Sequence, residues 1–129
     1  MDCLFCKIAK KEIPSDWVYE DQNFFAFLDI KPLNPGHTLV IPKKHYRWVW
    51  DIKEDYSQTT NKIANAIKKA LKTDYIQSIV MGDEVAHAHL HLIPRFTHDG
   101  HAGLVDLKNK KQISPEEMKK IAVKIKTFL

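Results

Sequence analysis

The chain has 129 residues, of which 44% are hydrophobic, and this length suits one compact domain spanning residues 1–129. Its formal net charge is +4, but the excess lysine lies mostly near the C-terminus, on what we expect to be a solvated helix face. Basic residues are not interleaved with aromatic ones, so we expect no nucleic-acid partner. The N-terminus turns polar too early for a signal peptide, and no apolar run approaches the about 20 residues of a membrane span. These features predict a cytoplasmic protein with no membrane partner.

The first part of the chain predicts three strands. Aromatic and β-branched runs at residues 17–20 and 24–28 are separated by three polar residues, which is typical of a hairpin. A third run, residues 37–41, begins after Gly36 and ends before Pro42, and both of these residues favour turns. We therefore expect a β-rich N-terminal part.

The next part predicts a helix followed by two strands. Apolar residues recur at helical spacing within residues 57–72, which indicates an amphipathic helix. Residues 76–81 and 87–93 then have strand character, because they are short apolar runs or strict alternations.

A second helix is predicted at the C-terminus. Ser114 suits the cap position, Pro115 the first helical position, and Glu117 completes a capping box three residues after the cap. Strands with one helix inserted and another appended favour an α+β domain. We expect about five antiparallel strands, covered on one face by two helices.

Three histidines alternate with apolar residues in the last predicted strand. Residues two apart on a strand lie on the same face, about 6.6 Å from one another. The pattern therefore predicts a row of three imidazoles, His87, His89 and His91, opposite a core face formed by Ala88, Leu90 and Leu92.

This row of imidazoles admits three interpretations. A metal site is possible in principle, but a metallo-β-lactamase-type site would need an acidic residue after the second histidine, and a cupin-type site a glutamate downstream; the chain has neither. Nucleophilic catalysis fits better, since one neutral imidazole can attack phosphorus while its neighbour protonates the leaving group. A merely solvated strand face would not require three histidines at strict period two.

The two cysteines, Cys3 and Cys6, have the spacing of a metal-binding or redox pair. No βαβ pattern follows them, so a thioredoxin-like role is not supported. A pair of inert thiols remains an alternative.

The chain resembles the bacterial Hint-like branch of the histidine-triad (HIT) superfamily. The resemblance rests on the alternating histidines followed by Pro94-Arg95, on Gly36-His37-Thr38, on the Pro-Lys-Lys-His run that ends at His45, and on Glu12-Ile13-Pro14. It extends in order over nearly the first hundred residues. It implies a HIT-like fold and assembly as a homodimer.

The resemblance also implies roles for individual residues. His89 would be the nucleophile that attacks the α-phosphorus and carries a transient nucleotidyl group, while His91 and His37 would contact the phosphate region. Asp29 would accept the ribose hydroxyl groups, which suits an ionised carboxylate. The apolar residues implied to line the base cleft, which ordinary core packing would also explain, are Leu4, Phe5, Ile8, Phe27 and Ile30.

Members with a Cys-x-x-Cys pair resemble a zinc-bound subgroup. Carried over to this chain, the ligand set is Cys3, Cys6, His45 and His87. Two thiolates and two imidazoles suit a closed tetrahedral zinc site with a structural role.

The function that the resemblance implies is hydrolysis or nucleotidyl transfer at the α-phosphate of a nucleoside phosphoramidate or a related purine nucleotide conjugate. Two alternatives are a dinucleoside polyphosphate hydrolase and a nucleotide-binding module without significant turnover. The chain departs from the common family pattern before the triad, where Asp83 stands in place of a glutamine and two polar donors are missing. We assign no role to His98 and His101, which follow the last strand.

Overall fold

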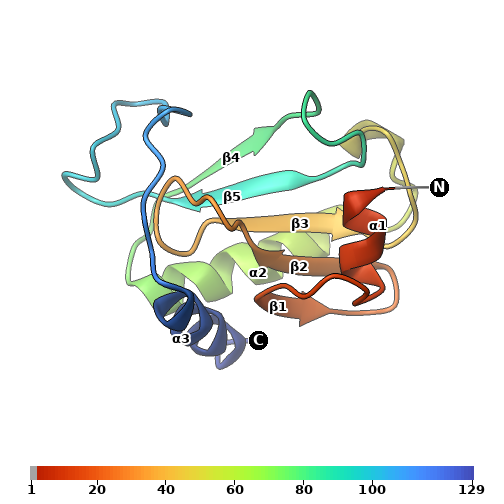
Figure 1. Cartoon of the computed structure of the whole chain (residues 1–129), viewed down its shortest axis with the longest axis horizontal. Coiled ribbons are helices and arrows are strands. Elements are labelled where there is room, and N and C mark those ends of the chain that lie inside the picture. The colour runs from red at the N-terminus through yellow and green to blue at the C-terminus, as the bar shows by residue number, and fades with distance from the viewer. Residues whose placement is uncertain (1–2) are drawn as a thin grey trace.

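The computed structural model describes residues 3–129 as a five-stranded antiparallel sheet with helices on both faces (Figure 1). The strands lie in the order β1-β2-β3-β5-β4. In chain order the elements are α1 (Leu4–Ala9), β1 (Trp17–Glu20), β2 (Phe24–Leu28), β3 (Thr38–Pro42), the 3₁₀ turn η1 (Val49–Asp51), α2 (Tyr56–Leu71), β4 (Ile76–Val80), β5 (Leu90–Pro94) and α3 (Pro115–Lys126). The predicted α+β class and the five antiparallel strands are confirmed.

The central strands β2 and β3 are buried along their whole length because both faces of the sheet are covered. Ala26 and Leu28 belong to the core cluster that α2 and α3 close, whereas Phe25 and Phe27 belong to the cluster under α1. Strands buried on both faces have continuous apolar runs instead of clean alternation. This explains the aromatic run in β2.

Helices α2 and α3 cover one face, as predicted, and their ends follow local capping rules. The Asp55 side chain accepts a hydrogen bond from the Gln58 N–H at the start of α2, and Ser114 accepts one from the Glu117 N–H at the start of α3. α2 ends at Lys72, which is left-handed with φ 56°. None of the helices in residues 3–129 is long and apolar enough to cross a membrane.

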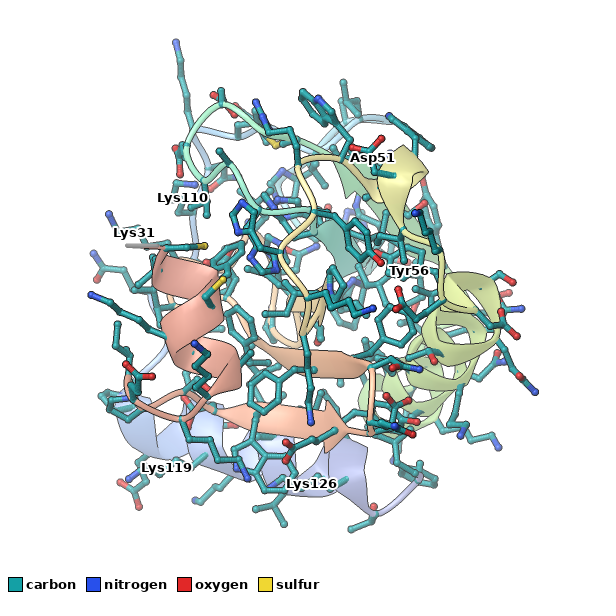
Figure 2. All side chains as sticks on the ribbon, turned by 90° about the vertical axis from the view of Figure 1, so that its right-hand side faces the viewer. Lys31, Asp51, Tyr56, Lys110, Lys119 and Lys126 are labelled. Carbon is teal, nitrogen blue, oxygen red and sulfur yellow. The ribbon has the colours of Figure 1, made fainter. Side chains whose placement is uncertain are left out.

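The sequence did not predict the third helix, α1, which packs on the opposite face of the sheet (Figure 2). A helix of 6 residues is too short to show helical periodicity or to be stable alone. It is stabilised by burying Phe5 and Ile8 against the sheet. The Cys3 Sγ caps it by accepting a hydrogen bond from the Cys6 N–H at 3.5 Å.

The prediction that residues 87–93 form one strand was also partly wrong, since β5 begins only at Leu90. Its ladder with β3 ends at the pair Val40 and Leu90. Beyond that point the chain is held by the segment after β3, whose Tyr46 carbonyl accepts a hydrogen bond from the Ala88 N–H at 2.7 Å. Pro42 ends β3 and has no N–H with which to continue the ladder.

Candidate functional site

The three triad histidines do not form a single row. His89 and His91 remain neighbours, with ring centroids 5.0 Å apart, and His37 from the start of β3 lies 5.1 Å from His91. His87 is fully buried and faces the N-terminal cysteines instead. The two histidines just before β5 therefore belong to different groups. His89 joins His37 and His91, whereas His87 joins a cluster of potential metal ligands.

His89 has one ring nitrogen held and the other free to react. Its Nδ1 lies 2.7 Å from the His87 carbonyl oxygen, which can only accept, so Nδ1 carries the proton. A neutral His89 then has its lone pair on Nε2. The Phe5 ring contacts His89 edge-on at 5.0 Å between centroids and fixes the imidazole from the side of α1.

Hydrogen bonds also set the tautomers of His37 and His91. The Leu33 N–H donates to His37 Nδ1 at 3.0 Å, so His37 carries its proton on Nε2. That Nε2–H lies 2.9 Å from His91 Nδ1 and donates to it. His91 is thereby left with its proton on Nε2. One proton donor and one lone pair thus sit on adjacent imidazoles, His91 and His89.

Burial lowers the pKa values of His37 and His91 and keeps both imidazoles neutral at pH 7. It lowers the pKa of His37 to about 3, and it lowers the pKa of His91 to about 4 with a smaller contribution from neighbouring positive charge. The positive charge of Lys110 lowers both pKa values further.

These shifts predict a loss of stability in acid. Both folded-state pKa values lie below the ordinary value of about 6.5, so below that pH the unfolded chain binds more protons than the folded one. The contribution to stability is complete above about pH 6.5 and is lost as the pH falls towards the folded-state pKa values. We expect the free energy of unfolding, measured with urea at pH 7.5, 5.5 and 4.5, to fall less steeply in His37→Gln than in the native protein. An equal dependence of the free energy of unfolding on pH in the two proteins would contradict this prediction. His98→Asn, at an exposed histidine, serves as the control.

Asp29, directly after β2, lies beside His37 and His91. Its Oδ2 is 3.6 Å from His37 Nε2, and its Oδ1 accepts a hydrogen bond from the Lys31 N–H at 2.9 Å. The Asp29 N–H donates to the His37 carbonyl at 2.9 Å, which joins the ends of β2 and β3. The structure thus brings together the predicted residues Asp29, His37, His89 and His91. The carboxylate of Asp29 is the partly exposed member of this group.

His101, to which the sequence assigned no role, forms hydrogen bonds that hold the segment before β3. Its Nε2–H donates to the Leu33 carbonyl at 2.8 Å, and its Nδ1 accepts from the Asp106 N–H at 2.9 Å. The Leu33 residue held in this way is the one that donates to His37. No local pattern could have indicated a contact between residues 68 positions apart.

The predicted metal ligands form the second cluster. The potential ligand atoms of Cys3, Cys6, His45 and His87 all lie within 4.8 Å of one another. His87 Nδ1 is 3.4 Å from Cys3 Sγ and 3.5 Å from Cys6 Sγ, and His45 Nδ1 is 3.5 Å from Cys6 Sγ. Tetrahedral zinc, with bonds of about 2.3 Å to sulfur and about 2.05 Å to nitrogen, would put these atoms about 3.6 Å apart. The donor set therefore fits zinc in both chemistry and spacing.

The orientation of His87 is also suited to a metal. Its Nε2–H donates to the Pro42 carbonyl at 2.9 Å, so the Nδ1 lone pair faces the two sulfur atoms. Burial lowers the pKa of His87, which favours the neutral form that a ligand needs.

The five apolar residues expected to line a base cleft divide into two groups. Phe5, Ile8 and Phe27 are buried in the core cluster under α1. Leu4 and Ile30 lie outside that cluster and are 47% and 81% exposed. Only Leu4 and Ile30 have a large apolar surface available to a ligand.

The segment before the triad is held by two residues that the sequence did not single out, Arg47 and Trp48. Arg47 donates from Nη2 to the Gly82 carbonyl at 3.0 Å and stacks on Trp48, with its Cζ 4.0 Å from the ring centroid. A Cβ at Gly82 would lie 2.6 Å from the Trp48 ring, so glycine permits this close approach. Asp83, next to it, is exposed.

Comparison with known proteins agrees with this geometry. An adenosine 5′-monophosphoramidase of Saccharomyces cerevisiae is 40% identical over 80% of this chain and 67% of its own length, and an adenylylsulfatase of Arabidopsis thaliana is 36% identical over 76% and 54%. The crystal structure of a Zn-bound histidine triad family protein from Mycobacterium smegmatis has a TM-score of 0.75 and 27% identity, covering 99% of this chain and 93% of that one. The HIT domain profile matches residues 10–98. The chain therefore belongs to the HIT domain family.

Proposed function

We propose that the protein is a hydrolase or nucleotidyl transferase that cleaves at the α-phosphate of a nucleoside phosphoramidate or a related purine nucleotide conjugate. The observation that carries the proposal is the pair of adjacent imidazoles with opposite capacities, a free Nε2 lone pair on His89 and an Nε2–H on His91. The names of the two relatives, a phosphoramidase and an adenylylsulfatase, support the same reaction centre.

The reaction would proceed in two displacements. His89 Nε2 attacks the α-phosphorus, and a P–N bond forms while the bond to the leaving group breaks. An anionic substrate raises the pKa of His91, which can then be protonated and give its proton to the departing nitrogen or oxygen. Water next attacks phosphorus, the bond to His89 breaks, and His91 takes up the proton of the water. The nucleoside monophosphate is released, His91 gives its proton to the solvent as this anion leaves, and both histidines return to their starting states.

His37 would act as a positioning residue for His91. Its Nε2–H occupies Nδ1 of His91, so the remaining His91 nitrogen is the one directed to the substrate. Asp29 would accept hydrogen bonds from the ribose hydroxyl groups, and the exposed apolar side chains of Leu4 and Ile30 would contact a purine, with Phe5, Ile8 and Phe27 behind them.

Zinc bound by Cys3, Cys6, His45 and His87 would supply structure and no chemistry at the reacting phosphorus. These ligands connect α1 to the segment that leads into His89. They would therefore hold the nucleophile in place from outside the reaction centre.

The test is the release of AMP from adenosine 5′-phosphoramidate, followed by chromatography, in water enriched in ¹⁸O. We expect AMP that carries one ¹⁸O on phosphorus, because water completes the second displacement. AMP release from a dinucleoside polyphosphate but not from the phosphoramidate would favour the first alternative. Binding of AMP without release from either substrate would favour a nucleotide-binding module, the alternative that the exposed Asp83 and the missing donors support. A homodimer stays a prediction, which light scattering tests against the chain mass of 15.0 kDa.

A further inference from the structure

A groove of about 650 Å³ begins next to Asp29, and apart from Ile30 its lining residues take no part in the reaction described above. Ile30 and Lys31, directly after Asp29, form one wall, and residues 110–114 form the other. Figure 2 shows Lys31 and Lys110 on the same side of the molecule, and both residues line the groove. The groove thus brings together a segment before β3 and the segment that leads into α3.

The wall formed by residues 110–114 is fixed by a backbone contact. The Lys111 N–H donates to the Pro32 carbonyl at 2.7 Å, which anchors this segment to the Asp29 side of the site. The Lys111 ammonium lies 3.4 Å from His101 Nε2 and is therefore directed towards His101. Lys110, the residue before it, is exposed and lines the groove.

Two positive charges in this groove are uncompensated. Within residues 3–129, neither Lys31 nor Lys110 forms an ion pair. Lys110 is close enough to the site for its charge to lower the pKa of both His37 and His91. A bound anion near Lys110 would therefore be within electrostatic reach of the reaction centre.

We propose that this Lys31–Lys110 groove binds a second anionic group of the substrate, a phosphate or sulfate beyond the α-phosphate. The proposal rests on the proposed function, since it places the α-phosphate at His89 and His91. A flexible ammonium group pairs with such an anion as a point charge and does not require bidentate geometry.

The second anion could stand at either end of the nucleotide, on the leaving group or on the ribose 3′ oxygen. Calorimetric titration with AMP, ADP and adenosine 3′,5′-bisphosphate distinguishes the two. We expect ADP or the bisphosphate to bind about three- to tenfold more tightly than AMP at low salt, and this gain to shrink as salt screens the charges. The tighter of the two ligands identifies the end of the nucleotide that enters the groove.

The variants Lys110→Ala and Lys31→Ala are expected to lose this gain in affinity. Lys108→Ala removes an exposed lysine from the same segment outside the groove, and it should retain the gain. Equal affinity of the native protein for all three ligands would overturn the proposal, as would a gain that survives in Lys110→Ala. If AMP itself does not bind, both this inference and the proposed function fail. If AMP is released from the phosphoramidate but all three ligands bind equally, only this inference fails and the proposed function stands.

Discussion

Replacing His89 with glycine is expected to lower kcat/KM for adenosine 5′-phosphoramidate by about 10³-fold or more. The variant lacks the only nitrogen that can form the covalent bond to phosphorus in the proposed reaction, whereas His37, His91 and Asp29 remain. AMP release, followed by chromatography, measures the effect. Calorimetry with AMP shows whether the site still binds its product.

Added imidazole separates loss of the nucleophile from loss of structure. Free imidazole can enter the space left by the His89 ring and attack the α-phosphorus, so consumption of the substrate by His89→Gly should rise with imidazole concentration. His98→Asn is the matched control, because His98 is exposed and its φ of 62° suits asparagine. A glycine variant that keeps its turnover within tenfold of the native value would exclude His89 as the nucleophile.

The second large effect is expected at the cluster of cysteines and histidines. Zinc bound at a thousandfold excess over its dissociation constant adds about 4 kcal/mol to the free energy of unfolding. For a chain of 129 residues, its removal should lower Tm by about 10 °C or more. The loss is expected because α1 is too short to remain folded without tertiary contacts.

This prediction is checked by elemental analysis and thermal unfolding of the native protein, before and after treatment with a chelator. Cys3→Ser should bind less zinc and have a lower Tm even without the chelator, and His98→Asn should match the native protein. Cobalt substitution adds a spectroscopic readout, because thiolate-to-metal absorption bands appear only if the cysteines are ligands. Zinc well below one atom per chain after purification without chelator would refute the assignment.

The secondary structure that the sequence predicted correctly depends on local chemistry. The helix now seen as α2 was expected within one residue of its bounds, because its amphipathic period is long. The Ser114 cap likewise marked the start of α3. α1 was missed because its stability comes from burying Phe5 and Ile8, residues that carry no periodic pattern in a segment of 6 residues.

The sequence identified the chemical groups of the candidate site but not their arrangement. The alternation of His87, His89 and His91 predicted one row, and the structure instead turns His87 to the cysteines because the β3–β5 ladder ends before it. This is a tertiary effect, since the last pair of the ladder is Val40 and Leu90, and the chain before Leu90 is held instead by the Tyr46 carbonyl.

By itself, the sequence determined the α+β class, the five strands, the family and the residue types that can attack phosphorus or hold zinc. The tertiary structure decided which nitrogen of His87, His91 and His101 carries the proton, since their partners Pro42, His37 and Leu33 lie 45, 54 and 68 residues away along the chain. It also brought Lys110 within electrostatic reach of His37 and His91. Periodicity and caps act over a few residues and can be seen in the chain, whereas hydrogen bonds and electrostatic contacts between distant residues exist only after the strands have paired.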